Sequence, residues 1–283
     1  MMALLEELDD GEDDGAEYAL LSEVLVSAAI NADIPIPKTY KQAVNDPVYG
    51  KMWKAAIDEE IQSLQENQTW EEIVLPKGQQ LVDSKWVFTV KWNPDGTLER
   101  FKARLVGRGF SQQYGVNYTE TFAPTVQMTT LRAFLSVVAA EDLECRHYDI
   151  KNAFTEASMQ EDVFMKAPEG VQVKKGCVLK ILHSLYGLKQ SARDWNQLLK
   201  SMMLKWGFTQ SLADPCLFVY KGYSLMALVY VDDIAVAGKD NAALEWFFAQ
   251  LTGRFTAKDL GEIKQFLGMQ ITRDRKNCTL YLD

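Results

Sequence analysis

The 283-residue sequence lacks any apolar run as long as the roughly 18 to 20 residues that a membrane-spanning helix needs, so we expect no membrane partner. It has only four cysteines, which are far apart and form no Cys-x-x-Cys pair, and two histidines that have no second soft ligand nearby. These shortages argue against a zinc site and against a disulfide framework. The first 37 residues contain no Lys or Arg, which is unlike a secretory signal or transit peptide. We therefore expect an intracellular, reducing location, in the cytoplasm, the nucleus or both.

Acidic charge is concentrated at the start of the chain. The net charge is −9, yet residues 1–37 carry ten acidic side chains, and the rest of the chain has 29 acidic and 30 basic residues. Such a charged segment cannot bury itself, so residues 1–45 are predicted to form a mobile arm. Residues 77–109 hold seven basic and three acidic side chains, which leaves a local basic surface for phosphates.

The remainder mixes helical and strand periodicity without regular βαβ alternation, which favours an α+β fold. Apolar residues at helical spacing predict a helix that starts at Asp46-Pro47, and three more over 130–140, 190–206 and 241–251. Alternation on both sides of the turn at 93–96 predicts a β-hairpin, whose second strand gathers Arg100, Lys102 and Arg104 on one face. Further strands are predicted over 145–150, 163–165, 178–182, 225–230, 234–237 and 266–271. A short helix is expected over 20–30.

Two adjacent aspartates, Asp232 and Asp233, lie between two almost wholly apolar strands. An Asp-Asp pair is usually a polar turn, but it is not the Asn-Gly or Asp-Gly chemistry that a tight hairpin prefers. Two like charges at the edge of a core repel each other and lose hydration unless cations compensate them. The pair is therefore a candidate metal site.

Asp149 ends a strand of its own. It either caps the following turn or, if its strand lies beside the hairpin, converges with Asp232 and Asp233. Carboxylate oxygens suit Mg²⁺, and two such ions about 4 Å apart can activate an attacking hydroxyl and stabilise a leaving oxygen. The sequence by itself does not show that the strands are neighbours.

Seven motifs in order over some 220 residues resemble the reverse transcriptase of copia-type (Ty1/copia) long-terminal-repeat retrotransposons. They are KARLVGRGF (102–110), ETFAP (120–124), DIKNAF (149–154), VFMKAPEG (163–170), LYGLKQSARDW (185–195), YVDD (230–233) and FLGM (266–269).

The resemblance implies a right-hand polymerase, with the reverse transcriptase domain over about 52–283. Fingers are expected over 46–145 and a palm over 146–283, the palm being a ferredoxin-like antiparallel sheet with helices on one face. The chain stops near the end of such a palm, so the thumb is expected to be absent or truncated. Asp149 and Asp232 would be the principal metal ligands, with Asp233 supporting them.

Other residues take implied roles by their position in the motifs. Lys102 and Arg104 would cradle the incoming triphosphate, unless they form a solvated strand face. Phe154 would crowd a ribose 2′-OH, although it could equally be a core phenylalanine. After it, Thr155-Glu156-Ala157 replaces the Leu-Asn-Gly common in the family. Nucleotide or template contacts are expected from Gly187, Lys189 and Gln190, and primer or template contacts from Tyr230, Phe266, Leu267 and Gly268, the last three also suiting an apolar core strand.

The implied function is RNA-directed DNA polymerase activity within a retrotransposon polyprotein, with a primer 3′-hydroxyl attacking the α-phosphorus of a deoxynucleoside triphosphate. The implied partners are an RNA or DNA template with its primer and deoxynucleoside triphosphates, and the cofactors are two Mg²⁺ ions, with Mn²⁺ as an alternative. The oligomeric state is not indicated. One alternative is an inactive retroelement remnant or host-adopted fragment that binds nucleic acid or a protein partner. Another, a metal-dependent phosphohydrolase, would not call for the basic hairpin or Phe154.

Overall fold

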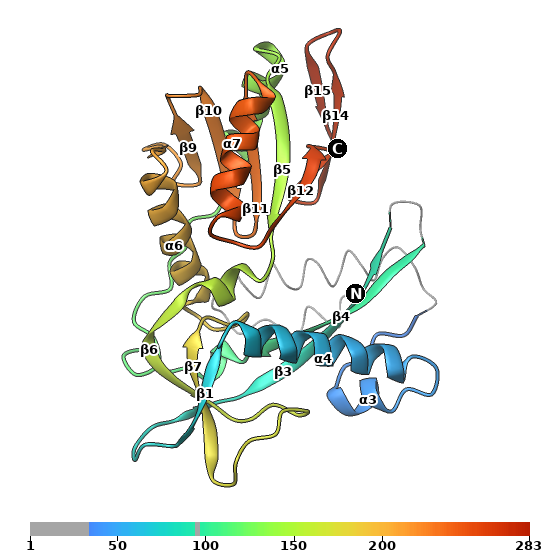
Figure 1. Ribbon diagram of the computed structural model, residues 1–283, viewed down its shortest axis with the longest axis vertical. Coiled ribbons are helices and arrows are strands. Elements are labelled where there is room, and N and C mark those ends of the chain that lie inside the picture. Colours follow the sequence, from blue (N-terminus) through green and yellow to red (C-terminus); the bar gives the residue numbers. More distant parts are fainter. Residues whose placement is uncertain (1–33, 94–96) are drawn as a thin grey trace. The chain divides into compact units, whose positions relative to one another are not determined.

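The computed structural model describes residues 34–93 and 97–283 (Figure 1). Most of the predicted arm, the helix predicted over 20–30 and the centre of the turn at 93–96 lie outside these residues. The chain forms two compact units, one of Met1–Thr119 with Met159–Ser191 and the other of Glu120–Ser158 with Ala192–Asp283. The division into fingers and palm stays a prediction. Within the described part of the chain, no helix has the length and apolar character needed to cross a membrane.

The described part of the first unit contains the α-helices α3 and α4, a hairpin and a small mixed sheet (Figure 1). The sheet has the strand order β1-β7-β6-β2, in which β1 and β7 pair antiparallel and β2 and β6 pair parallel. The long hairpin of β3 and β4 pairs by itself. The elements are α3 (Tyr40–Val44), α4 (Gly50–Glu66), β1 (Trp70–Val74), β2 (Leu81–Val82), β3 (Ser84–Trp92), β4 (Leu98–Gly107), η2 (Gly109–Ser111), β6 (Ser158–Met165) and β7 (Cys177–His183).

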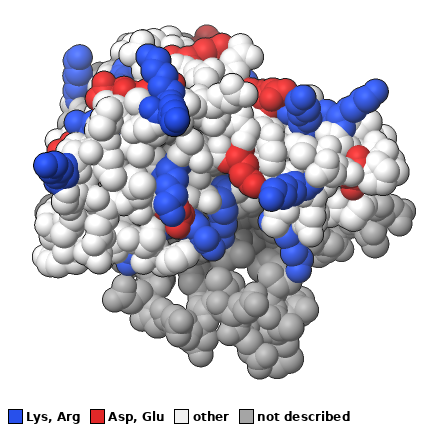
Figure 2. Space-filling model, turned by 90° about the horizontal axis from the view of Figure 1, so that it is seen from below, with Lys and Arg blue, Asp and Glu red and all other residues white. Residues whose placement is uncertain are grey.

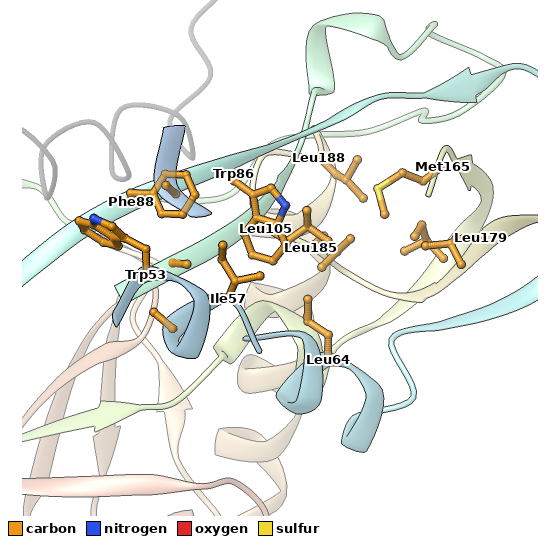
Figure 3. Close-up of a cluster of buried hydrophobic side chains, with 14 of the residues drawn as sticks. Trp53, Ile57, Leu64, Trp86, Phe88, Leu105, Met165, Leu179, Leu185 and Leu188 are labelled. Carbon is orange, nitrogen blue, oxygen red and sulfur yellow. The ribbon is translucent and has the colours of Figure 1, made fainter. Parts of the chain in front are cut away.

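The apolar stripe of α4 forms the centre of this unit's core, against the inner faces of β3 and β4 (Figure 3). Trp53 of α4 is fully buried, and its ring meets the ring of Phe101 edge-on at 4.5 Å. Leu105, also fully buried, lies on the same face of β4 as Phe101, as the alternation in the sequence predicted. The predicted helix and hairpin are therefore confirmed, and they pack against each other.

The second unit is built on a six-stranded antiparallel sheet with the order β12-β5-β11-β10-β9-β8. A separate three-stranded sheet, β13-β14-β15, closes the chain. The elements are α5 (Met128–Ala140), β5 (Glu144–Ile150), η3 (Ala153–Glu156), α6 (Ser191–Lys205), β8 (Thr209–Gln210), β9 (Leu217–Tyr220), β10 (Leu225–Tyr230), β11 (Asp233–Gly238), α7 (Asn241–Thr252), β12 (Ala257–Glu262), β13 (Gln265–Phe266), β14 (Met269–Asp274) and β15 (Thr279–Leu282).

Helices cover both faces of the large sheet, whereas the sequence predicted helices on one face. On one face Tyr148 of β5 packs against Phe247 of α7, with ring centroids 5.7 Å apart. On the other, Leu131 and neighbouring residues of α5 share a cluster with Ala235 of β11. The physical reason is that consecutive residues of β11, Ile234 and Ala235, are both fully buried. A strand that is apolar on both sides needs cover on both sides.

The strand predicted over 266–271 is wrong. Leu267 and Gly268 form a tight turn between β13 and β14, with φ of 53° and 78°. The segment therefore folds back on itself instead of continuing as one strand. The sequence did not reveal the turn because leucine residues rarely adopt positive φ, so a leucine at position 267 favours a strand.

Helical structure is already present before the predicted helix start at Asp46-Pro47. Helix α3 precedes it, with the Thr39 side chain accepting a hydrogen bond from Gln42 N. Asp46 does not begin α4, which starts at Gly50. Its carboxylate instead accepts hydrogen bonds from Val48 N and Tyr49 N, at 2.9 and 2.7 Å. Asp46 thus stabilises the turn that leads into α4.

Candidate active site

Two of the three predicted catalytic aspartates, Asp149 and Asp233, lie on neighbouring strands of the second unit. Strand β11 pairs with β5 in antiparallel register, and Asp233 lies directly opposite Asp149. Side chains opposite each other on antiparallel strands leave the same face of the sheet, with Cβ atoms about 4.5–5.5 Å apart. The structure therefore shows that the two strands are neighbours, which the sequence alone did not show.

Asp232 lies in the turn of the β10–β11 hairpin. Tyr230 pairs with Asp233, so the loop has two residues, Val231 and Asp232, instead of the three expected from the sequence. Val231 has a φ of 50°, which a β-branched residue rarely adopts. Two-residue hairpin loops commonly place glycine or asparagine at such a position, and strain of this kind costs about 1–3 kcal/mol.

Two hydrogen bonds hold this strained turn in place. The buried Trp195 of α6 donates from Nε1 to Val231 O at 2.7 Å. The Ile150 N–H donates to Asp232 O at 3.0 Å, which ties the turn to the residue that follows Asp149. The backbone of Asp232 is therefore fixed beside the end of β5. The role of Trp195 was not predicted from the sequence.

His147 is a further residue of this site that the sequence did not suggest. Its Nε2 lies 2.6 Å from Asp233 Oδ1, and its ring meets Phe266 edge-on at a centroid distance of 5.6 Å. His147 precedes Asp149 by two residues, so the period of two along β5 places both on one face. That spacing was the signal available in the sequence.

Tyr230 lies opposite Asp233 at the same end of the hairpin. Burial raises the pKa of Tyr230, and the nearby Asp232 and Asp233 carboxylates raise it further. Its phenol therefore stays neutral at physiological pH and keeps its proton for hydrogen bonding.

The carboxylates supply the oxygen donors that Mg²⁺ prefers. Across the described residues, no group of three or more His, Cys, Asp or Glu side chains is gathered closely enough to hold a metal ion. The arrangement thus offers a pair of aspartates in register and a third in the adjoining turn, without a closed cage of protein ligands.

Phe154 follows β5 in the short helix η3 and is 3% exposed. Thr155 donates from its backbone N to Asn152 O, and Arg254 pairs with Glu156 at 2.8 Å. The departure from the family pattern at 155–157 thus forms a defined turn. The burial of Phe154 suits both the sugar-contact and the core interpretation.

The predicted primer-contacting residues Phe266, Leu267 and Gly268 lie at the β13–β14 turn. Phe266 is 1% exposed and packs in the cluster that includes Ala235, whereas Gly268 is exposed. Phe266 is therefore a core residue whose ring also contacts His147.

Lys102 and Arg104 belong to the first unit and leave the same face of β4, as predicted. Lys102 is partly exposed, but Arg104 is 8% exposed and lies over the Tyr186 ring at 4.8 Å. Glu60 of α4 accepts a hydrogen bond from Leu105 N at 3.1 Å. Burial raises the pKa of Glu60, against the opposing effects of that hydrogen bond and of the Arg104 and Lys102 charges. Glu60 is thus a partly buried carboxylate close to the Arg104 and Lys102 charges, and the sequence did not suggest it.

Basic side chains also occur over a wider surface. Figure 2 shows a face on which Lys and Arg side chains are spread, with fewer Asp and Glu among them.

Gly187 lies in the first unit, where its φ is +80°. A Cβ at this position would lie 2.3 Å from Gly107 O and 2.4 Å from Val106 Cγ1. Gly107 N donates to Tyr186 O at 2.8 Å across the same contact. Gly187 therefore permits the close approach of its segment to Val106 and Gly107. Its contact with nucleotide or template stays a prediction.

Gln190 is fully buried, and its side chain is part of a hydrogen-bond network. Gln112 donates to Gln190 Oε1 at 2.9 Å, and Gln190 donates to Asn117 O at 2.8 Å. The neighbouring Lys189 donates from its backbone N to Gln112 Oε1, and its Nζ lies 5.2 Å from the centre of the Tyr118 ring. The network anchors the loop at 109–118, and no pattern in the sequence predicted it.

The predicted site residues are thus divided between the two units. The second unit contains Asp149, Phe154, Asp232 and Asp233, and the first unit contains Lys102, Arg104, Gly187, Lys189 and Gln190.

The mixed α+β architecture, with aspartates on neighbouring antiparallel strands, is the kind expected of a nucleic-acid polymerase domain. Residues 67–283 match the sequence profile of the family described as "Reverse transcriptase (RNA-dependent DNA polymerase)", and the chain belongs to this family. The resemblance to copia-type retrotransposon enzymes is confirmed by relatives named as retrotransposon polyproteins.

The "Retrovirus-related Pol polyprotein from transposon TNT 1-94" of Nicotiana tabacum is 39% identical over 252 residues, covering 87% of this chain and 19% of the relative. The "Retrovirus-related Pol polyprotein from transposon RE1" of Arabidopsis thaliana is 38% identical over 242 residues, covering 84% and 16%. The chain therefore spans less than a fifth of the length of these curated relatives.

Among solved structures, the "Structure of the foamy viral protease-reverse transcriptase dRH in complex with ds DNA" is similar over 77% of this chain and 34% of that chain. The sequence identity is 14% and the TM-score 0.38, and a likeness of this size carries no argument about function.

Proposed function

We propose that this reverse transcriptase domain catalyses template-directed DNA synthesis by two-metal nucleotidyl transfer, with Asp149 and Asp232 as the principal metal ligands and Asp233 in support. In this proposal the second unit, with the six-stranded sheet, provides the palm, and the β3–β4 hairpin belongs to the fingers. The substrates are deoxynucleoside triphosphates on a primed RNA or DNA template.

The observation that carries the proposal is the register between β5 and β11. It sets Asp149 opposite Asp233, while the bond from Ile150 N to Asp232 O ties the third aspartate to the same strand end. Carboxylates close together at one end of a sheet repel each other unless cations compensate their charge. Their arrangement therefore supports a function that binds cations.

The donor chemistry fits Mg²⁺. This ion keeps several waters and is usually held by one or two carboxylates together with substrate phosphates. A closed group of three protein ligands is therefore not required before substrate arrives. When bound, the ions would activate the primer 3′-hydroxyl and stabilise the leaving pyrophosphate.

Residues of both units have roles in this proposal. Lys102 would neutralise the triphosphate directly, and the more buried Arg104 would add positive charge behind it. Phe154 would favour deoxyribose by crowding a 2′-OH. Base pairing would select each nucleotide, so the protein needs to read only backbone shape.

The test is primer extension by the purified chain on a primed RNA template with Mg²⁺. Asp232→Asn should reduce extension by about 1000-fold or more, because it removes several kcal/mol of transition-state stabilisation. Circular dichroism checks that this variant keeps the fold of the wild-type chain. Asp58→Asn, which changes an exposed aspartate of α4, is the control and should extend normally.

Undiminished extension by Asp232→Asn would overturn the assignment of the site. A folded wild-type chain that binds primed template but does not extend it would favour the alternative, a non-catalytic nucleic-acid-binding remnant. Filter binding of the same template separates the two outcomes.

A further inference from the structure

One face of the large sheet carries a short polar row next to its carboxylates. Cys145, His147 and Asp149 alternate along β5, and Asp233 and Ala235 lie opposite Asp149 and His147 on β11. His147 is therefore the diagonal neighbour of Asp233 on the same face. Its Nε2 lies 2.6 Å from Asp233 Oδ1, and the two side chains are 13% and 35% exposed.

The direction of this hydrogen bond follows from the chemistry of its partners. An ionised carboxylate only accepts, so His147 Nε2–H is the donor and Asp233 Oδ1 the acceptor. Bonds of this charge-assisted kind are stronger than neutral ones. One oxygen of Asp233 is thus engaged by the protein, while Oδ2 can serve a cation or a cation-bound water.

The imidazole is itself held in one orientation. The Phe266 ring meets it edge-on, at an interplanar angle of 77°, and Phe266 is 1% exposed within the cluster that contains Ala235. A ring confined between a buried phenylalanine and the sheet cannot swing away from Asp233 without disturbing that cluster.

We propose that His147 is a positioning residue: it fixes the Asp233 carboxylate, so that Asp233 supports the metal ions through its other oxygen. The inference rests on the proposed function, since it assumes that Asp149, Asp232 and Asp233 bind cations. In addition, Phe266 of the β13–β14 hairpin fixes the orientation of the His147 ring. The position of this hairpin is therefore linked to the orientation of the Asp233 carboxylate. Partners that orient a metal ligand typically contribute about 10–100-fold in metal affinity or activity.

The test compares four variants of the whole chain. His147→Leu removes the donor, His147→Gln keeps an N–H at about the reach of Nε2, and His147→Asn is polar but too short to reach Asp233. His183→Gln, at the chain's other histidine, is the control. Circular dichroism and the melting temperature check that each variant folds.

Binding of Mn²⁺ to the protein without nucleotide, measured by electron paramagnetic resonance, is the readout that does not depend on turnover. The Mg²⁺ concentration that gives half-maximal primer extension is the second readout. His147→Leu and His147→Asn should both weaken metal binding by about 10–100-fold. His147→Gln should restore most of the affinity, and His183→Gln should match wild type.

Phe266→Leu should weaken metal binding in the same direction but less, because the histidine keeps its donor and loses only its orientation. If His147→Leu fails to fold, the comparison of glutamine with asparagine at the same position still decides the matter. Equal Mn²⁺ affinity for these two polar variants would overturn the positioning role.

The result for the wild-type chain separates this inference from the proposed function. Wild type that binds Mn²⁺ and extends primers, beside a folded His147→Leu of unchanged metal affinity, overturns the positioning role alone. Wild type that neither binds Mn²⁺ at the aspartates nor extends primers overturns both.

Discussion

Asp214, in the same unit as the site aspartates, shows what a carboxylate does when the protein itself supplies its hydrogen bonds. It is 1% exposed, and its two oxygens accept from Cys216 N at 2.8 Å and from Gln127 N at 3.1 Å. Burial raises the pKa of Asp214, but hydrogen bonds from Thr130, Cys216 and Gln127 together hold it below its usual value. Asp214 therefore ties the start of α5 to the loop before β9.

Because the pKa of Asp214 is lowered in the folded state, the stability it contributes is present above the pKa of an unfolded aspartate and is lost as the pH falls through the folded value. Asp214→Asn should cost about 1.5–3 kcal/mol at pH 7, since an amide nitrogen would then face a backbone N–H donor. The cost should shrink as the pH falls below about 4, where the unfolded carboxyl becomes protonated. Urea unfolding of both proteins across this range measures it, and a cost that does not change with pH would refute the account.

His147 shows how much of the site could be read at the level of single residues. The period of two along β5 puts it on the face of Asp149, so its side could have been predicted. Its bond to Asp233 could not, because these residues are 86 positions apart and meet only through the register of β5 with β11.

At the scale of elements, the contact between Gly107 and Gly187 can be tested by comparing alanine substitutions at Gly187 and at Gly176. Gly187 and Gly176 have similar φ values, +80° and +83°, but a Cβ at Gly176 would meet no atom within 4 Å. Substituting alanine at Gly176 should therefore cost only the backbone conformation, about 1–2 kcal/mol.

Gly187→Ala should cost more, by about 1–3 kcal/mol, because its Cβ would overlap the Gly107 carbonyl and force the two segments apart. Chemical denaturation of the two variants side by side gives the difference. Equal losses of stability would show that the close approach is not required.

Elements with a clear apolar period were predicted well, and those fixed by tertiary contacts were not. The α4 helix and the β3–β4 hairpin follow their patterns, since burial of one face decides them. The turn at Val231 carries no local signal, because Trp195 and Ile150 hold it from elsewhere in the sequence. Short strands such as β8 and β12 were missed because two residues, or a largely exposed edge, show no readable period.

At the scale of the whole molecule, the chain passes three times between its two units, since residues 159–191 return to the first one before the chain enters the second unit again. No local pattern announces such a return. The same holds for the hydrogen-bond network in which Gln190 bonds to Gln112 and Asn117, because Gln190 is more than 70 residues from both along the chain. Motif order identified the family, whereas the partners of each motif residue required the structure.

The central claim is that divalent ions bind where β5 meets the β10–β11 hairpin. With added hydrogen peroxide and ascorbate, Fe²⁺ bound in place of Mg²⁺ reduces the peroxide to hydroxide and a hydroxyl radical, and the radical cuts the backbone close to the ion. The cuts locate the site without requiring catalysis. We predict cuts in two segments far apart in the sequence, around Asp149 and around 231–233, that disappear when Mg²⁺ competes and in Asp232→Asn. Cleavage confined to other parts of the chain, or cuts at these segments that Mg²⁺ does not suppress, would contradict the account.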